Sequence, residues 1–243
     1  MCVVAKPTHR KEDTMISSLT ITDPSHGPID HGAKVPWFAE LGRIEFDPGL
    51  NVIVGPNGSG KTTLIRTIAA LGRCLQGGTP KDTNQSAQML QGKTGASVET
   101  DGAPTFLVDP ELSPGLIGGM AAFDWDFAEE GTSLAMFRGS HGEATLHRMV
   151  LVLKGLKGHV GDGRPTVLLD EGERSLDLTR QLDYWRGIRS NAIRAQVIAS
   201  THNPFALWIP GARYIETISG YLQFVRRAVL IQISAALGGD EGK

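Results

Sequence analysis

The sequence predicts an α/β fold in which helices flank a mostly parallel core sheet, with a small antiparallel β lobe near the start of the chain. Three short apolar runs predict buried strands, at 50–54, 167–169 and 197–199. Polar residues follow each run, and apolar residues at helical spacing follow the first two. Because parallel strands end at one edge of a sheet, we expect these polar residues to lie close together.

The first strand leads into a phosphate-binding loop pattern, which is Gly55, four residues and then Gly60-Lys61-Thr62. Glycines in the loop let backbone N–H groups turn toward phosphate oxygens, and the following helix adds the positive end of its dipole. Lys61 is expected to reach the β and γ phosphates, and Thr62 to place its hydroxyl on Mg²⁺. A plain glycine-rich turn would not need this lysine and threonine. The expected phosphate-binding residues are Gly55, Asn57, Gly58, Ser59, Gly60, Lys61, Thr62 and Thr63.

An acidic pair ends the second strand, in "RPTVLLDEGERSLDL". Asp170 can hold the Mg²⁺ shell, and Glu171, which faces differently, can polarise a water molecule. The alternative is a strand-end pair that caps the following helix, but the phosphate loop upstream favours the catalytic interpretation. The sequence therefore predicts a P-loop NTPase fold with Thr62 and Asp170 as metal ligands.

A histidine follows the third strand, in "AQVIASTHNPF". A lone histidine at a strand end is more often a satisfied surface residue than a catalytic one. Here the parallel sheet would bring His202 to the same edge as Lys61 and Glu171, where it could approach a γ-phosphate.

These motifs resemble the ABC-type ATPase superfamily, in particular its soluble branch with the SMC and recombination-repair ATPases. "GPNGSGKTT" resembles Walker A, "VLLDEGERSLD" resembles Walker B with a D-loop that ends in Asp177, and "THNP" resembles the switch-histidine segment. The resemblance covers about 18–224 and implies ATP and Mg²⁺ as cofactors, with Glu171, His202 and Lys61 as catalytic residues. Gly172 stands where many relatives have proline.

A degenerate signature sequence lies between the Walker motifs, in "RGSHGEATLHRMVLVLKGL". Ser140, Gly142 and Glu143 fit the family pattern, whereas His141 replaces its first glycine. The resemblance implies that these residues bind the γ-phosphate of a second subunit, so that two ATP molecules lie within a head-to-tail homodimer. The alternative is a helix N-cap in which Ser140 and Glu143 form a capping box.

Other motifs of the family cannot be assigned to single residues. Gln85, Gln88, Gln91 or Asp109 could act as the glutamine loop, and Trp37 or Phe38 could stack on adenine. The choice of adenine over guanine is therefore implied by the resemblance alone.

The order of the motifs predicts one ATPase domain over 1–243. Within it we expect a flexible N-terminus at 1–17, a mobile insertion at 76–104 and a C-terminal tail at 226–243. Strands at 18–22 and 42–46 predict the antiparallel lobe. "RYIETISGYLQF" predicts a hairpin that turns at Ser219-Gly220. The helix after the D-loop is expected to bury the residues Leu178, Leu182, Trp185 and Ile188.

Composition narrows the classes of partner and compartment. A net charge of −2 gives no bulk reason for nucleic acid binding, and acidic residues alternate with the arginine cluster at 174–194. Cys2 and Cys74 are too few for a disulfide framework, and no run of about 18 apolar residues occurs. We therefore expect a soluble cytoplasmic protein without a membrane span.

The predicted function is Mg²⁺-dependent ATP hydrolysis, in which ATP drives homodimerisation and switches an effector protein. One alternative is the nucleotide-binding subunit of a membrane transporter, although Asn203-Pro204 after His202 differs from the acidic residue usual there. The other is an ATP sensor that does not hydrolyse ATP and that regulates a nuclease or toxin, against which the presence of Glu171 argues.

Overall fold

The computed structural model of the protein describes residues 15–21, 42–72, 95–101, 103, 105–108, 164–174 and 176–238. Five parallel strands form the central sheet, in the order β5-β6-β7-β3-β8. Their bounds are β3 (Leu50–Val54), β5 (Thr105–Val108), β6 (Thr166–Asp170), β7 (Gln196–Thr201) and β8 (Arg213–Glu216). The three predicted core strands lie side by side at its centre, as expected from their continuous apolar runs.

The strand register aligns the ends of the central strands. Val54 of β3 pairs with Thr201 of β7, and Asp170 of β6 pairs with Ser200 of β7. The residues that follow these strands therefore leave the sheet at one edge. This α/β architecture agrees with the predicted P-loop NTPase fold.

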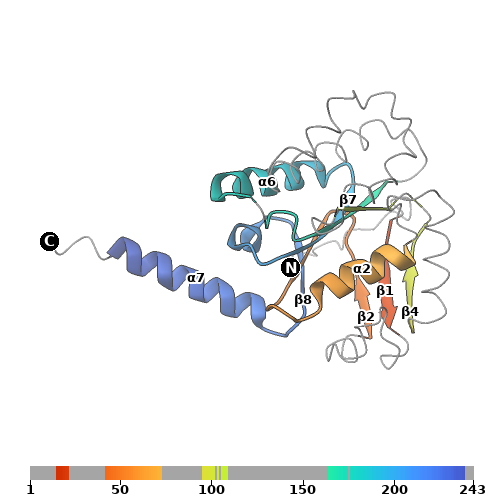
Figure 1. Ribbon diagram of the computed structural model, residues 1–243, viewed down its shortest axis with the longest axis horizontal. Helices are drawn as coiled ribbons and strands as arrows, with labels where there is room; N and C mark the ends of the chain where they lie inside the picture. Colours follow the sequence, from red (N-terminus) through yellow and green to blue (C-terminus); the bar gives the residue numbers. More distant parts are fainter. Residues whose placement is uncertain are drawn as a thin grey trace, which may run out of the picture.

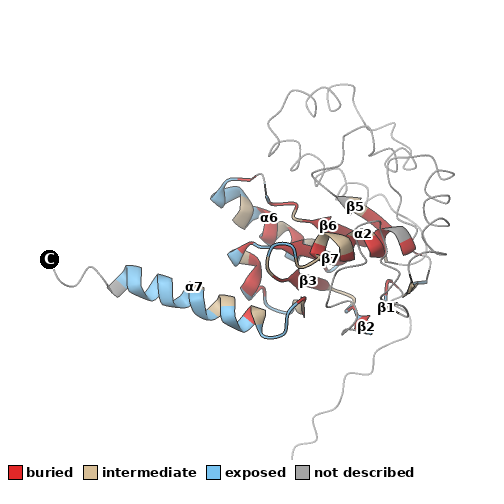
Figure 2. Cartoon of the chain, turned by 60° about the horizontal axis from the view of Figure 1, so that its bottom comes forward, coloured by how far each residue is buried: buried red, intermediate tan, exposed pale blue. Residues whose placement is uncertain are grey.

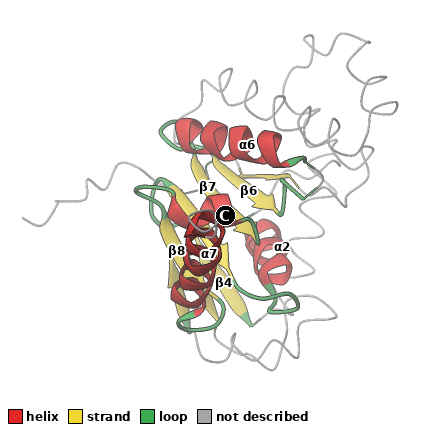
Figure 3. Cartoon of the chain, turned by 90° about the vertical axis from the view of Figure 1, so that its left-hand side faces the viewer, coloured by secondary structure: helices red, strands yellow, loops and turns green. Residues whose placement is uncertain are grey.

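Two helices cover opposite faces of the sheet (Figure 3). Leu64, Ile65 and Ile68 of α2 (Lys61–Leu71) pack on the face that presents Ile53, Leu168 and Ile198. Tyr184, Trp185 and Ile188 of α6 (Leu178–Asn191) pack on the face that presents Val52, Leu169 and Val197. Neighbouring residues of a strand point to opposite faces, so each central strand contributes to both cores.

A second, three-stranded sheet lies beside α2. It consists of β2 (Arg43–Glu45), β1 (Ser18–Ile21) and β4 (Ala96–Glu99), paired antiparallel in that order. Leu19 and Ile44 join the core on the α2 side. The two strands predicted for the antiparallel lobe are confirmed. Strand β4 lies within 76–104, so this part of the predicted insertion is an ordered element of the sheet.

The predicted hairpin at 213–224 is wrong. Strand β8 pairs in parallel with β3, and the residues after Gly220 form the helix α7 (Tyr221–Gly238). The predicted tail at 226–243 therefore begins inside α7. This helix contacts the 3₁₀ helix η4 (Pro204–Trp208) and then projects from the body of the protein (Figure 1).

Much of α7 is exposed (Figure 2). Its exposed side chains include large apolar ones. These are Phe224, Leu230, Ile231, Ile233 and Leu237. Among the described helices, α7 included, we find none that is long and apolar enough to cross a membrane.

One predicted core residue of α6 is exposed. Leu178 has 68% of its surface exposed, and Leu182 is only half-buried, whereas Trp185 and Ile188 are buried as predicted. Tyr184 is buried in the core, where Leu178 and Leu182 were expected. The buried side of α6 is therefore narrower than the apolar spacing indicated, and it is centred on Tyr184, Trp185 and Ile188.

Candidate functional site

The loop at 55–60 joins β3 to α2 in the conformation that glycine permits. Gly58 and Gly60 have φ angles of 73° and 90°, in the left-handed region that other residues rarely adopt. Gly60 is also the N-cap of α2 and offers no side chain to the first backbone N–H groups of the helix. These N–H groups can therefore donate to an anion.

Lys61 opens α2 and turns its side chain back over the loop. Its Nζ donates to the carbonyl oxygens of Gly55 at 3.3 Å and Pro56 at 3.2 Å, and only 4% of the residue is exposed. Burial lowers the pKa of Lys61, and the nearby charges of Glu171 and Asp170 oppose that shift. The lysine is a buried cation held against the loop.

Asp170 ends β6 and accepts two hydroxyl hydrogen bonds on Oδ1. Thr62 Oγ1 donates at 3.2 Å, and Ser200 Oγ of β7 donates at 2.5 Å. Among the described residues, no three or more His, Cys, Asp or Glu side chains are grouped so that they could hold a metal ion. One carboxylate and one hydroxyl fit Mg²⁺, which keeps several water ligands and takes the rest from substrate phosphates.

Glu171 is the only described residue other than glycine with a positive φ, at 45°. Its backbone N–H donates to both the carbonyl oxygen and the hydroxyl of Ser200, each at 3.2 Å. The turn places Glu171 Oε1 3.1 Å from His202 Nε2 and 3.9 Å from Lys61 Nζ. The hydrogen bond with His202 is the largest cause that lowers the pKa of Glu171, against the opposing effect of burial.

His202 Nε2 lies between a cation and an anion. It is 2.6 Å from Lys61 Nζ and 3.1 Å from Glu171 Oε1. One imidazole nitrogen cannot accept from the lysine and donate to the carboxylate at once. When Nε2 carries the proton, it donates to Glu171 Oε1, and a hydrogen bond of this kind lowers the pKa of the carboxyl. In the other tautomer, Nε2 accepts from Lys61.

Thr217, which no motif in the sequence marks, supports the loop. Its Oγ1 donates to Ser59 Oγ at 2.8 Å. A Cβ on Gly55 would lie 1.8 Å from Thr217 Oγ1, so the loop can pass Thr217 only with glycine at this position. The predicted hairpin could not indicate this contact, because it paired β8 with the residues after Gly220, whereas β8 pairs with β3.

Of the other predicted site residues, Asn57 and Thr63 belong to the loop and helix of this site, Asp177 lies at the start of α6, and the rest lie outside the described part of the chain. Asn57 is exposed, and Thr63 lies on α2. Asp177 is the N-cap of α6, where Oδ1 accepts from the backbone of Arg180 at 3.0 Å. The residues outside the described ranges are Ser140, Gly142, Glu143, Trp37, Phe38, Gln85, Gln88, Gln91 and Asp109.

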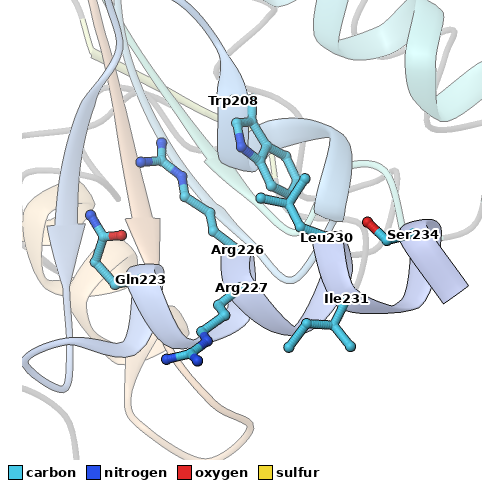
Figure 4. Close-up of a pocket in the computed structure, with 7 residues that line it drawn as sticks. All are labelled: Trp208, Gln223, Arg226, Arg227, Leu230, Ile231 and Ser234. Atoms are coloured by element: carbon cyan, nitrogen blue, oxygen red, sulfur yellow. The ribbon is translucent and has the colours of Figure 1, made fainter.

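A pocket lies between η4 and α7, and it includes none of the residues of the phosphate-loop cluster (Figure 4). Its lining contains arginine, apolar and neutral polar side chains but no carboxylate or imidazole, and the residues are Trp208, Gln223, Arg226, Arg227, Leu230, Ile231 and Ser234. The cluster at the sheet edge does contain a carboxylate and an imidazole beside a buried lysine, and we take it as the candidate active site.

Comparison with known proteins agrees with this assignment at the level of class. Residues 37–113 match a family model described as an AAA domain, a match that includes β3, the loop and α2 but less than half of the chain. Among the curated proteins, none matches this chain. The match and the fold together support a P-loop ATPase of the AAA type, and this class implies that the chain binds ATP.

Proposed function

We propose that this protein is a magnesium-dependent ATPase of the soluble ABC-like class, which pairs head to tail on binding ATP and so switches an effector protein. The observation that carries the proposal is the convergence of Lys61, Glu171 and His202, with Nζ, Oε1 and Nε2 within 3.9 Å of one another. Three separate segments of the chain supply these side chains, which is typical of a catalytic site at a sheet edge.

Lys61 and the loop amides would bind the β and γ phosphates, because both present N–H donors at the start of α2. Thr62 Oγ1 and Asp170 Oδ1 would hold magnesium, which when bound supplies positive charge to the phosphate oxygens. A γ-phosphate that accepts from Lys61 would replace the contact between Lys61 and His202. His202 would then donate either to the phosphate or to Glu171.

Glu171 would orient the attacking water and accept its proton. The lowered pKa of its carboxyl favours the charged form, which can accept a hydrogen bond from water at neutral pH. Hydrolysis breaks the bond between the γ-phosphorus and the bridging oxygen, and the products are ADP and phosphate.

The dimer and the effector are further parts of this proposal. Ser140, Gly142 and Glu143 would complete the nucleotide site of the partner subunit, as the resemblance implies. The side chain of Asp177 is 60% exposed at the start of α6, so that a second subunit could reach it. The exposed apolar side chains of α7 would offer contacts to an effector protein.

Titration calorimetry with Mg·ATP tests the nucleotide site. Wild-type protein should bind, and Lys61→Ala should lose measurable binding, because the loop loses its buried cation. Arg189→Ala removes an exposed cation from α6 and serves as the control that keeps binding. An undiminished affinity of Lys61→Ala for ATP would exclude this loop as the nucleotide site.

A further inference from the structure

A chain of buried hydrogen bonds lies behind the Glu171 and His202 pair. It joins three segments, which are the turn after β6, the first turn of α6, and the end of β7 with the residues that follow it. Its four members are Glu173, Gln181, Thr201 and Asn203. Glu173, Thr201 and Asn203 are 4%, 1% and 6% exposed, and Gln181 is half-buried.

The bonds form a closed path. Thr201 Oγ1 donates to Glu173 Oε1 and accepts from the backbone N–H of Asn203 at 2.8 Å. Asn203 Nδ2 donates to Gln181 Oε1 at 2.7 Å. Gln181 Nε2 then donates to the carbonyl oxygen of Leu176 at 2.8 Å. The backbone N–H of Leu176 donates to the carbonyl oxygen of Glu173 at 3.0 Å, which closes the path. We call these four residues the Glu173 network.

The Glu173 network flanks both catalytic candidates. Glu171 lies two residues before Glu173, and His202 lies between Thr201 and Asn203. Thr201 and Asn203 are buried in the network, whereas 31% of the His202 side chain is exposed and its Nε2 contacts Lys61 and Glu171. A shift of His202 away from Glu171 would therefore strain buried hydrogen bonds on both of its sides, and a buried polar group that loses its partner destabilises the fold.

The burial of Glu173 in the turn after β6 carries a desolvation penalty, because its carboxyl is removed from water. The pKa of Glu173 is raised to about 7, chiefly by burial and to a smaller extent by the charges of Glu171 and Asp170, while the hydrogen bond from Thr201 opposes the shift. Among the described atoms, neither Glu173 Oε2 nor the hydroxyl of nearby Tyr184 has a hydrogen-bond partner. An apolar residue would fill this space at a lower cost, so stability alone does not account for Glu173.

We propose that Glu173, Gln181, Thr201 and Asn203 are positioning residues that hold His202 against Glu171. This inference rests on the proposed function for its effect on turnover, but its geometry does not depend on that function. The network links the turn after β6, which carries Glu171, to the end of β7, which leads to His202. A movement of Glu171 therefore affects the position of His202. None of its members needs to touch the nucleotide.

The Thr201→Val and Thr201→Ser pair tests the inference. Valine keeps the buried shape and loses the hydroxyl, whereas serine keeps the hydroxyl. Thr201→Val should lower kcat for ATP at least about tenfold while the ATP dissociation constant stays within about twofold, which is the scale of a misplaced catalytic group. Thr201→Ser should recover most of kcat. A Thr201→Val enzyme with wild-type kcat would overturn the inference.

A second measurement separates this inference from the proposed function. The imidazole ¹⁵N resonances of His202, assigned with His202→Gln, should shift in Thr201→Val and return toward wild type in Thr201→Ser. An absence of ATP turnover in the wild type would refute the proposed function, and these resonances would still test the positioning. Unshifted resonances in Thr201→Val would refute the positioning even in an active enzyme.

Gln181→Met provides a variant at a half-buried position in case Thr201→Val does not fold. It removes the bond from Asn203 while keeping the length of the side chain. The same loss of kcat and the same His202 shift are expected. Wild-type values for both would overturn the inference.

Discussion

Glu171 combines an unusual backbone conformation with a defined side-chain position. A positive φ in a residue other than glycine costs about 1–3 kcal/mol and persists only where surrounding contacts enforce it. Here Ser200 provides both a carbonyl oxygen and a hydroxyl to the N–H of Glu171. The same Ser200 hydroxyl donates to Asp170, so one residue of β7 orients both acids of the β6 end.

Glu171→Gln should retain ATP binding and slow hydrolysis at least about a hundredfold, because the amide cannot accept a proton from water. Steady-state phosphate release gives the rate, and calorimetry gives the affinity. Glu45→Gln removes an exposed carboxylate from β2 and is the control. Unchanged turnover in Glu171→Gln would assign the water to another residue, with His202 the next candidate.

The sequence predicted the residues that gather at the sheet edge but not those that hold them. Lys61, Glu171 and His202 each follow an apolar run, so their strands and shared edge could be inferred. Thr217 contacts Ser59, and Ser200 contacts Asp170 and Glu171, across neighbouring strands of the sheet. A local sequence pattern does not show which strands are neighbours, so these contacts could not be predicted. Glu173 has no pattern in the sequence that separates it from the charged residues around it, because burial is not visible in the sequence alone.

At the scale of elements, the strands with continuous apolar runs were predicted, whereas the parallel pairing of β8 with β3 was not. Strand β8 is short and half-buried, and the Ser219-Gly220 turn after it resembles a hairpin turn. Gly220 does have a positive φ, of 79°, but the turn leads into α7, whose Leu222 N–H donates to Glu216 Oε2 at 2.9 Å. The partner of β8 is β3, which lies far upstream in the sequence.

Gly172 is required by the way α6 packs on the turn after β6. A Cβ at this position would lie 2.1 Å from the Tyr184 hydroxyl and 3.1 Å from the ring carbon that carries it. Tyr184 is in the core, so its ring cannot move aside without disturbing its neighbours. The tyrosine on α6 therefore accounts for the glycine at position 172.

Gly172→Ala should destabilise the protein by about 1–3 kcal/mol, the usual cost of forcing extra volume into a packed core. Tyr184→Phe removes the oxygen that clashes and should reduce that cost by about 1 kcal/mol. Urea denaturation of the four members of this double-mutant cycle measures the coupling. Equal costs of Gly172→Ala in both backgrounds would show that the contact with Tyr184 is not the reason for the glycine.

At the scale of the whole molecule, the raised pKa of Glu173 links folding to pH. The carboxyl has a pKa of about 7 when folded and an ordinary value of 4.5 when unfolded, so the folded state binds the extra proton between these values. The proton on Glu173 contributes its full stabilisation to the folded state below about pH 4.5. This contribution is lost as the pH rises to about 7, and above that pH the free energy of unfolding no longer changes through this carboxyl. At about 1.4 kcal/mol per pKa unit, the change is on the order of 3 kcal/mol.

Wild-type protein should therefore lose more stability between pH 5 and pH 8 than Glu173→Gln, which has no carboxyl to ionise. Urea denaturation at the two pH values measures both differences. Glu171 has a lowered pKa and is ionised throughout this window, so it adds a constant term to both proteins. If the two proteins show the same change between pH 5 and pH 8, Glu173 is not the group that links folding to pH.

The proposed switch requires two copies of the molecule, since Ser140 and Gly142 can act on ATP only if a second subunit presents them. In the Glu171→Gln background, Mg·ATP should convert a monomer or loose pair into a tight dimer, because each bound γ-phosphate completes the interface. Light scattering during size exclusion, with and without ATP, measures the mass directly.

Addition of Ser140→Arg to Glu171→Gln should block the ATP-dependent dimer. The larger cation would fill the space intended for phosphate oxygens of the partner, while Lys61 and Thr62 stay intact, so each subunit should still bind ATP. Ser190→Arg places the same side chain on an exposed position of α6 and should leave dimerisation unchanged. If the Ser140→Arg protein still dimerises with ATP, then "SHGE" is a helix cap and the two nucleotide sites do not meet through it.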